Sequence, residues 1–449
     1  FLLSFFVWGS HKKLFIHPSI HSFVCLFIHS FVHFFVWISH VVWETCACMP
    51  SVWTNRGWLA GASLTCLLHS AWSVAQHSFS FLHIVNPGYK YQKAITGERR
   101  YSLVRNRYKE FKEDGSFLQD KTSCFYFYKI ISKEGHEFNG IIAGASTLDY
   151  QNNIIKKHEN TLKRKEIIFE QYLKTVGFNA EPVLLTYPDN TSLKKIIEAV
   201  MLTRAEYEFT TTFRDTHYVW NVNDEKIIKQ VEVIFSKMNK LYIADGHHRS
   251  ASSSLLTTHL KNENSDHTGE EPYNFFMSYL IPESELQIYE FNRLVKDLNG
   301  LSKEEFLISL DEYFRIENRG NSYYKPSKKH HFSMYLDGEY YSLYLRKEGY
   351  QIKNSLDTLD VQILFDTILK PILGINDLRN DSRIEYPHGK TNLAYIKSMI
   401  DSNKFAVGFS LLPITIQELK NVADEGLTMP PKSTFIEPKL RSGITIYEF

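Results

Sequence analysis

The chain has 449 residues, 43% of them hydrophobic and 14% aromatic, which is enough apolar material for the cores of about two or three domains. Its 51 basic and 50 acidic residues leave a formal net charge of +1, which excludes a global field that attracts nucleic acid or an anionic membrane. Only one of the five cysteines, Cys124, follows position 66. This distribution excludes a disulfide framework for the main body and predicts a reducing, cytoplasmic compartment.

Residues 1–76 differ in composition from the rest of the chain. They hold a single acidic residue, Glu44, six of the seven tryptophans and four of the five cysteines, and they lack an initiator Met. Residues 14–43 contain no Asp, Glu, Lys or Arg, a length sufficient for a membrane helix, but five histidines interrupt them. We therefore expect residues 1–76 to be a fragmentary or misassigned terminus outside the fold, and a membrane-anchored form through residues 14–43 is the less favoured alternative.

Helical and strand patterns alternate from residue 77 to about residue 270. Apolar spacing and turn residues predict helices over 99–115, 163–177 and 191–204, and strands over 123–132, 138–147, 182–187 and 207–213. A hairpin is expected around 133–135, because Lys133-Glu-Gly135 separates two strand-like runs. This alternation predicts a mixed α/β domain over residues 77–270.

Longer strands follow the polar stretch 262–271, where we place a soft domain boundary. The pattern predicts strands over 274–281, 286–291, 331–336 and 340–345, and helices over 303–314 and 357–369. Residues 271–449 are therefore expected to form a second, α+β domain, so the predicted fold class of the whole chain is α+β.

The run Asp245-Gly-His-His-Arg249 is the leading candidate site. The apolar residues 241–244 predict a buried strand and residues 250–260 a helix, so residues 245–249 are expected to form the turn between them. A helix amino terminus offers backbone amides and a positive dipole end to a phosphate or carboxylate. Gly246 permits close approach to the anion, Arg249 offers a bidentate fork, and His247 and His248 are suited to donate hydrogen bonds or transfer protons.

This run allows two other interpretations. In one, Asp245 merely caps the helix and the histidines satisfy buried neighbours. In the other, Asp245, His247 and His248 bind zinc, but adjacent histidines on one turn point in different directions and no Cys-rich or His-Glu-x-x-His pattern completes a tetrahedron. The phosphate interpretation is preferred, and no metal ligands are assigned to the protein.

A second candidate is Lys156-Lys-His-Glu-Asn-Thr161. Lys156 or Lys157 is suited to neutralise phosphate oxygens, His158 adds an imidazole, and Glu159 can hold magnesium or accept a hydroxyl proton. The alternative is a solvated helix cap. The basic and proline-rich tail, residues 429–443, is a third candidate, because it can fold over a site and form an anion clamp or remain a rigid surface loop.

The sequence resembles a bacterial family of unknown function, domain family 1015, over about residues 77–449. Five motifs in order carry the resemblance: Lys157-His-Glu-Asn-Thr161, Phe178-Asn-Ala-Glu-Pro182, Ile243-Ala-Asp-Gly-His-His-Arg249, Tyr273-Asn-Phe-Phe276 and the tail 429–443. The run 245–249 with Ala251 is also similar to the phosphate box of the ParB and sulfiredoxin superfamily, which includes free serine kinases, although the alanine falls one position early.

The resemblance implies a cytoplasmic protein with a ParB- or sulfiredoxin-like part, ATP or ADP with Mg²⁺ as cofactor, and phosphotransfer to a small hydroxylated metabolite such as free L-serine. In that scheme Glu159, His158 and Asp245 are catalytic, whereas Gly246, His247, His248, Arg249 and Lys157 bind the nucleotide. The alternative is a non-catalytic, nucleotide-switched DNA-binding or regulatory protein, for which no basic helix-turn-helix is seen. Residues 1–76 lack the family's amino-terminal motifs, so the resemblance assigns no catalytic role to Glu44.

Overall fold

The computed structural model describes residues 5–6, 13–16, 80–91, 93–390 and 393–449. Most of residues 1–76, including residues 17–43 of the apolar stretch, lie outside the described residues, so the expectations for them stay predictions. Among the residues that are described, no helix has both the length and the apolar character needed to cross a bilayer.

The chain divides into two compact units. The larger comprises residues 122–170 and 181–441 with Phe5–Phe6, and the smaller comprises residues 171–180, 442–449 and the described residues between 13 and 121. Helix α6 (Lys163–Val176) is divided between them at residue 170.

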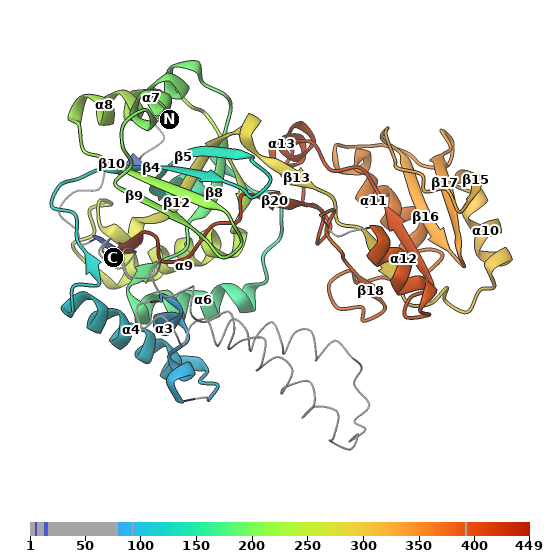
Figure 1. Cartoon of the computed structure of the whole chain (residues 1–449), viewed down its shortest axis with the longest axis horizontal. Coiled ribbons are helices and arrows are strands. Elements are labelled where there is room, and N and C mark those ends of the chain that lie inside the picture. Colours follow the sequence, from blue (N-terminus) through green and yellow to red (C-terminus); the bar gives the residue numbers. More distant parts are fainter. Residues whose placement is uncertain (1–4, 7–12, 17–79, 92, 391–392) are drawn as a thin grey trace, which may run out of the picture. The chain divides into compact units, whose positions relative to one another are not determined.

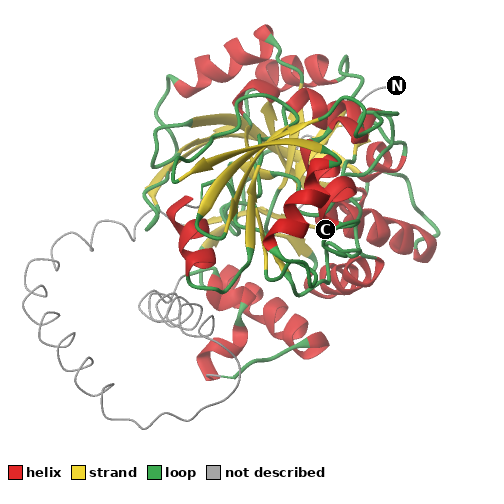
Figure 2. Ribbon diagram, turned by 90° about the vertical axis from the view of Figure 1, so that its right-hand side faces the viewer, coloured by secondary structure: helices red, strands yellow, loops and turns green. Residues whose placement is uncertain are grey.

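A large mixed sheet forms the centre of the larger unit (Figure 2). Helices α7 (Thr191–Met201) and α8 (Glu225–Phe235) lie together on one face, and α9 (His247–Glu263) lies on the other (Figure 1). In order across the sheet, the strands are β6 (Ile155–Lys156), β11 (Leu241–Asp245), β8 (Val183–Tyr187), β12 (Phe275–Pro282), β5 (Glu137–Ser146), β4 (Phe125–Ile131), β10 (Thr216–Val222) and β9 (Tyr207–Thr210), with β1 (Phe5–Phe6) paired to β5.

The hairpin predicted around residues 133–135 is confirmed. Strands β4 and β5 pair antiparallel from Ile131 opposite Glu137, and the Ser132 amide donates to His136 O at 2.8 Å across the turn. Gly140 in β5 is required by close packing, because a Cβ there would lie 2.4 Å from Leu280 O of β12. Strand β12 therefore leaves no room for a side chain at this position of β5.

Helix α9 packs closely because its buried face consists of small side chains. Ser250, Ser252 and Thr257 are buried, and their hydroxyls donate to carbonyls within the helix. Such internal bonds satisfy buried hydroxyls without a partner on the sheet. The short helix α5 (Thr147–Gln151), capped by the Ser146 side chain, packs beside α9.

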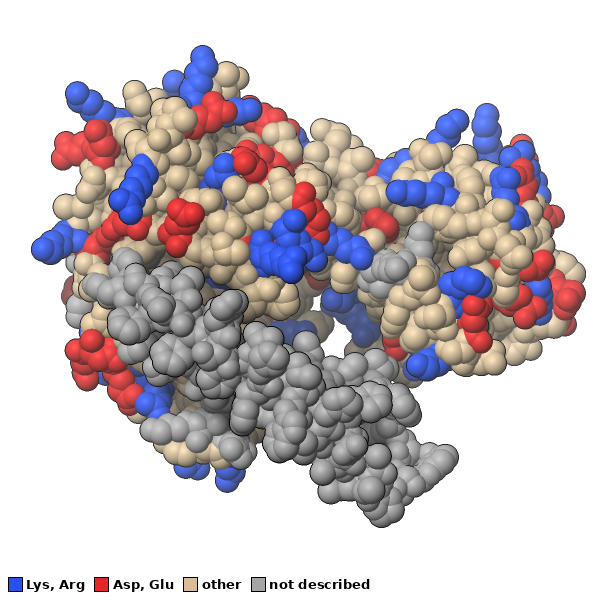
Figure 3. Space-filling view, viewed as in Figure 1, with Lys and Arg blue, Asp and Glu red and all other residues tan. Residues whose placement is uncertain are grey.

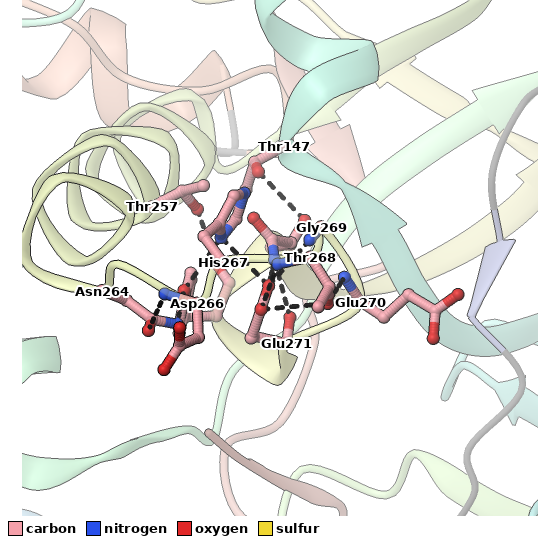
Figure 4. Close-up of polar contacts among 11 residues, drawn as sticks. Thr147, Thr257, Asn264, Asp266, His267, Thr268, Gly269, Glu270 and Glu271 are labelled. Atoms are coloured by element: carbon pink, nitrogen blue, oxygen red, sulfur yellow. Dashed lines mark hydrogen bonds and ion pairs between the residues drawn. The ribbon is translucent and has the colours of Figure 1, made fainter.

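The loop between α9 and β12 is locked by the Glu271 carboxylate (Figure 4). The carboxylate accepts the amides of Thr268 at 2.6 Å and Gly269 at 3.0 Å, and the side-chain amide of Asn274 at 2.9 Å. His267 Nδ1 lies 3.0 Å from the same group. These bonds fix the direction in which the chain re-enters the sheet at β12.

A second sheet lies in the carboxyl-terminal half of the larger unit. Its hydrophobic contacts include Leu294, Tyr335, Ile396 and Phe405. In order, its strands are β15 (Phe314–Gly320), β17 (Glu339–Leu345), β16 (His331–Leu336), β19 (Val407–Ser410), β14 (Arg293–Val295) and β18 (Ile384–Glu385), and its helices are α10 (Lys303–Asp311), α11 (Asp360–Leu364) and α12 (Leu393–Asp401).

Two helices predicted in this half are shorter than expected. The helix predicted over 303–314 ends at Asp311, because Phe314 begins strand β15 and is fully buried in it. The helix predicted over 357–369 is split into a 3₁₀ turn (Leu356–Thr358), α11 and a π-helical turn (Phe365–Leu369). The spacing of apolar residues does not reveal where the backbone hydrogen bonds change from the α-helical pattern to another.

The remaining elements of the larger unit connect to the tail. Helix α13 (Ile416–Asp424) begins with a capping box of Thr415 and Glu418, and strand β13 (Gln287–Tyr289) pairs antiparallel with β20 (Phe435–Glu437) of the tail. The predicted division at residues 270 and 271 stays a prediction. In the structure, β12 completes the large sheet, and the second sheet begins only at β14.

The smaller unit has its own core of aromatic side chains, with Tyr108 and Phe178 rings 4.3 Å apart. Its elements are β2 (Lys13–Ile16), α3 (Leu82–Val85), the 3₁₀ helix η3 (Pro87–Tyr91), α4 (Gly97–Glu113), β3 (Phe117–Leu118), β7 (Phe178–Asn179) and β21 (Ile446–Glu448). Helices and strands therefore mix in both units, which confirms the predicted class.

Candidate functional site

The two leading sequence motifs lie at one edge of the large sheet. Strands β6 and β11 pair in parallel, with Leu241 opposite Ile155, so the segments that follow both strands leave the sheet on the same side. Strand β8 is antiparallel to β11 and pairs Leu184 with Asp245. Residue Glu181, which precedes β8, therefore belongs to the same edge.

The turn after β11 is shorter than predicted. Residues 245–249 were expected to form the turn, but α9 already begins at His247, so His247, His248 and Arg249 form its first helical turn. The reason is Gly246, whose φ of 102° reverses the chain in a single residue. Because this N-cap residue has no side chain, it leaves the amides of the first turn without the usual cap.

Arg249 folds back over Gly246. A Cβ on Gly246 would lie 2.9 Å from Arg249 Nε and 3.0 Å from Nη2, so a side chain here would force the guanidinium to move. Arg249 donates to Glu181 and, at 3.3 Å, to Asp245 Oδ2. Burial lowers the pKa of Arg249 to about 10, so the group stays cationic at neutral pH.

A buried pair of imidazoles lies beside this turn. The His158 and His247 rings meet edge to face at 4.5 Å, and the His158 amide donates to His247 Nε2 at 3.5 Å. Burial lowers the pKa of His158 to about 4 and that of His247 well below its ordinary value, so both rings are neutral at pH 7. Because Nε2 accepts, the proton of His247 resides on Nδ1, which lies 3.7 Å from Glu159 Oε2.

Glu159 is the carboxylate that faces this imidazole. Partial burial raises its pKa; the nearby Arg379 opposes that shift and Asp245 adds to it. A raised pKa makes the carboxylate more basic. The two carboxylates that the sequence singled out, Glu159 and Asp245, are thus close enough to interact electrostatically.

The other predicted residues lie around this group. The Lys157 ammonium lies over the Tyr150 ring at 4.2 Å, and burial lowers its pKa. His248 also has a lowered pKa, again chiefly through burial. The buried Nδ1 atoms of His158 and His248 have no hydrogen-bond partner within the part of the chain that the structure describes. Such orphaned atoms at a site are available to a ligand or to water.

The tail, which the sequence offered as a third candidate, reaches both motifs. The Met429 amide donates to His158 O at 2.9 Å, and Lys439 Nζ lies 3.7 Å from Asp245 Oδ2. Arg379, which donates to Asn160 O at 3.1 Å, had no sequence signal because it is an isolated arginine in a polar loop. Glu181 lies within the family motif Phe178 to Pro182, but the sequence alone assigned it no role.

Charged side chains of both signs lie on the surface of the molecule. On the face drawn in Figure 3, Lys and Arg side chains are interspersed with Asp and Glu, in keeping with the near-zero net charge. Among the described residues, no three His, Cys, Asp or Glu side chains converge in a way that would hold a metal ion by themselves.

Comparison with known proteins gives one family match. The model of the family described as protein of unknown function (DUF1015) matches residues 70–362. No curated protein matches the sequence.

Several solved structures align with the chain at low similarity. A free serine kinase variant in complex with AMP has a TM-score of 0.34 and 11% identity, covering 68% of this chain and 92% of that chain. SbnI from Staphylococcus aureus, with a C-terminal truncation, has a TM-score of 0.36 and 12% identity over 67% and 85% of the two chains. A conserved hypothetical protein from Pyrococcus furiosus has a TM-score of 0.32 and 13% identity over 68% and 94%. This similarity is too low to assign a function to the site. The chemistry of the site is therefore inferred from its own residues.

Proposed function

The chain belongs to the DUF1015 family, and from that premise we propose that it binds the phosphates of ATP or ADP at the start of α9 and transfers a phosphoryl group to a small hydroxylated metabolite. The observation that carries the proposal is the opening of α9: a left-handed Gly246 N-cap with the Arg249 guanidinium folded over it. This arrangement stands at the edge where β6 and β11 both end.

The chemistry of this opening favours a phosphate. The first amides of the 17-residue helix α9 point out of its amino terminus, where the helix dipole is positive. Arg249 adds a planar donor fork that matches two phosphate oxygens. An independent feature is the orphaned Nδ1 of His158, a residue that is 3% exposed and whose ring meets His247, in the first turn of the same helix, edge to face.

The carboxylates of the site suit a nucleotide that arrives with Mg²⁺. Magnesium in nucleotide sites is held by one or two carboxylates together with phosphate oxygens and water, rather than by a preformed protein cage. The negative charge of Asp245 raises the pKa of Glu159. Asp245 would hold the ion, which would neutralise charge on the transferred phosphoryl group.

Glu159 is the proposed proton acceptor. Its raised pKa fits a base that takes the proton of the attacking hydroxyl group, and Nδ1 of the neutral His247 ring lies 3.7 Å from its Oε2 atom. The acceptor oxygen forms a bond to the terminal phosphorus, the bond from that phosphorus to the bridging oxygen breaks, and the nucleotide leaves one phosphate shorter. By the family resemblance, free L-serine is the first acceptor to test, and the cytoplasm is the proposed location.

Calorimetric titration with Mg²⁺–ATP and Mg²⁺–ADP tests the binding step. We expect Arg249→Ala to weaken binding about tenfold or more, since a charge-assisted bidentate contact contributes about 1.5–3 kcal/mol. The matched control is Arg204→Ala, an exposed arginine that follows α7. If Arg249→Ala binds as tightly as the control, the site assignment is wrong.

Phosphotransfer to a library of hydroxylated metabolites, with ATP and with ADP as donor, tests the reaction. We expect Glu159→Gln to abolish turnover while nucleotide binding is retained. If the wild-type protein binds nucleotide but phosphorylates no acceptor, a non-catalytic, nucleotide-binding role replaces the enzyme proposal.

A further inference from the structure

A groove of about 920 Å³ runs between helices α7 and α8, which lie side by side on the face of the large sheet opposite α9 (Figure 1). Apolar side chains form part of its lining. Ile196 of α7 and Ile234 of α8 are partly buried against the core of the sheet, whereas Val233 is 42% exposed. The groove therefore leaves apolar surface open between two helices.

The rim of this groove is basic. Lys195 of α7 and Lys226 and Lys229 of α8 line it, and Glu225 is the one acidic residue among the lining residues. None of the three lysines forms an ion pair with another residue in the part of the chain that the structure describes. The groove thus carries an excess of positive charge, although the chain as a whole is almost neutral.

The stability of α8 does not explain this arrangement. Lys226 lies in the first turn of α8, where the positive end of the helix dipole disfavours a cation. Lys229 repeats the charge three residues later on the same side of the helix. Val233, four residues further on, continues the same stripe with an exposed apolar side chain. A stripe that departs from the local preferences of a helix indicates a role in binding.

We propose that this groove binds an acidic amphipathic helix of a partner protein. The apolar face of the partner would pack against Ile196, Val233 and Ile234, and its carboxylates would pair with the lysines of the rim. The lining residues of α8 run from Glu225 to Ile234, about 14 Å along the helix axis, which is the length of roughly two and a half helical turns. The groove lies on the face opposite α9, so the inference does not depend on the proposed nucleotide site.

Two other occupants fit the charge of the groove less well. A second copy of this chain, packed groove to groove about a two-fold axis, would place one lysine rim against the other. Residues 17–79 of the chain itself, which lie outside the described residues, contain a single acidic residue, Glu44. Neither supplies the row of carboxylates that three lysines would pair with.

Fluorescence anisotropy with the full-length protein tests the inference. The probe is a labelled synthetic helix of about four turns, with leucines at positions i, i+3, i+4 and i+7 and glutamates on both sides of them. We expect this peptide to bind, and to bind less tightly as salt is added, because the charges of the rim are exposed. Two further peptides, one with lysines in place of the glutamates and one with glutamines in place of the leucines, should bind about tenfold more weakly.

Charge reversal on either helix tests the place of binding. Lys226→Glu on α8 and Lys195→Glu on α7 should each weaken binding of the acidic peptide about fivefold, because an attraction becomes a repulsion. Lys347→Glu makes the same change at an exposed lysine after β17 and should bind as the wild type does. An acidic residue is favoured in the first turn of a helix, so Lys226→Glu should not lower the melting temperature, and its loss of binding would not reflect unfolding.

Three results would overturn the inference. They are an acidic peptide that does not bind the wild-type protein, equal binding by Lys226→Glu and Lys347→Glu, and equal binding of the leucine and glutamine peptides. Binding to vesicles of anionic phosphatidylglycerol, without affinity for the peptide, would overturn the partner helix in favour of a membrane surface. Nucleotide titrations bear on the proposed function alone.

Discussion

Arg249, the last residue of the first turn of α9, forms an ion pair with Glu181, the residue two positions before β8. Asp245 also contacts this guanidinium, so two carboxylates surround it at the position proposed for phosphate. The Glu181 side chain is 48% exposed and the Arg249 side chain 22%, which makes Glu181 the partner that an incoming anion can displace.

Glu181→Gln should therefore tighten the binding of nucleotide in the absence of Mg²⁺. Exposed ion pairs contribute up to about 1 kcal/mol, so the expected gain is about two- to fivefold. Titration with ADP in EDTA measures it, and Glu208→Gln, which removes an exposed carboxylate of β9, is the control. Unchanged or weaker binding by Glu181→Gln would show that Glu181 does not compete with the ligand.

Gly246→Ala should disrupt the site beyond the ordinary cost of a left-handed residue. Strain at φ 102° contributes about 1–3 kcal/mol, and the new methyl group would also displace the Arg249 guanidinium. Gly300→Ala is the control, because Gly300 has a φ of 82° with nothing within 4 Å of its added Cβ. We expect both variants to unfold more readily, but only Gly246→Ala to lose ADP affinity. If the two variants bind ADP with equal affinity, the position of the Arg249 guanidinium does not depend on Gly246.

His158 should make the folded protein less stable in mild acid. Its pKa is lowered by burial to about 4, against 6.5 for an exposed histidine, so the folded chain binds fewer protons and stability falls as the pH decreases from 6.5 to 4. The full effect is about 3 kcal/mol. Urea unfolding across this pH range should show a flatter profile for His158→Gln, whereas the exposed-site control His136→Gln should keep the wild-type slope. Parallel profiles for wild type and His158→Gln would contradict the assignment of a neutral, buried ring.

Glu271 should stabilise the loop before β12 through its hydrogen bonds (Figure 4). Desolvation raises its pKa, but the hydrogen bonds from the Thr268 amide, the Thr268 hydroxyl and the Gly269 amide together outweigh this effect and lower the pKa to about 2. Glu271→Gln loses part of this acceptor set and should lower the melting temperature by a few degrees at pH 7, whereas the exposed neighbour variant Glu270→Gln should not. The difference should shrink as the pH falls toward 2, since the wild-type carboxyl then becomes protonated.

Local sequence patterns predicted the fold well where one strand or helix is bounded by turn residues. The β4–β5 hairpin and helix α6 are examples, because the strand pattern is interrupted at Gly135 and the helical pattern ends at Gly177. Strand β10 and helix α8 were missed, although α8 carries an Asp224 N-cap whose side chain accepts two amides. The order of strands in the large sheet could not be predicted, since β12 inserts between β8 and β5 through long-range pairing that no local pattern records.

In the candidate site, too, local patterns were predicted from the sequence and long-range contacts were not. Residues Asp245 to Arg249 and Lys157 to Glu159 were found because their composition is concentrated in short runs. Their proximity follows from the parallel pairing of β6 with β11, a relation 86 residues apart at Leu241 and Ile155 that sequence spacing does not reveal. Glu181 and Arg379 were missed because each is a single charged residue whose partner is distant in the chain.

Hydrogen–deuterium exchange at the start of α9 tests the central claim most directly, because it reports on the backbone amides proposed to hold the phosphates. Mg²⁺–ADP should slow exchange in peptides that cover residues 245–250 and 157–160, adenosine at the same concentration should not, and Arg249→Ala should remove the protection. Protection by adenosine alone, or protection by ADP confined to other parts of the chain, would contradict a phosphate site at this helix.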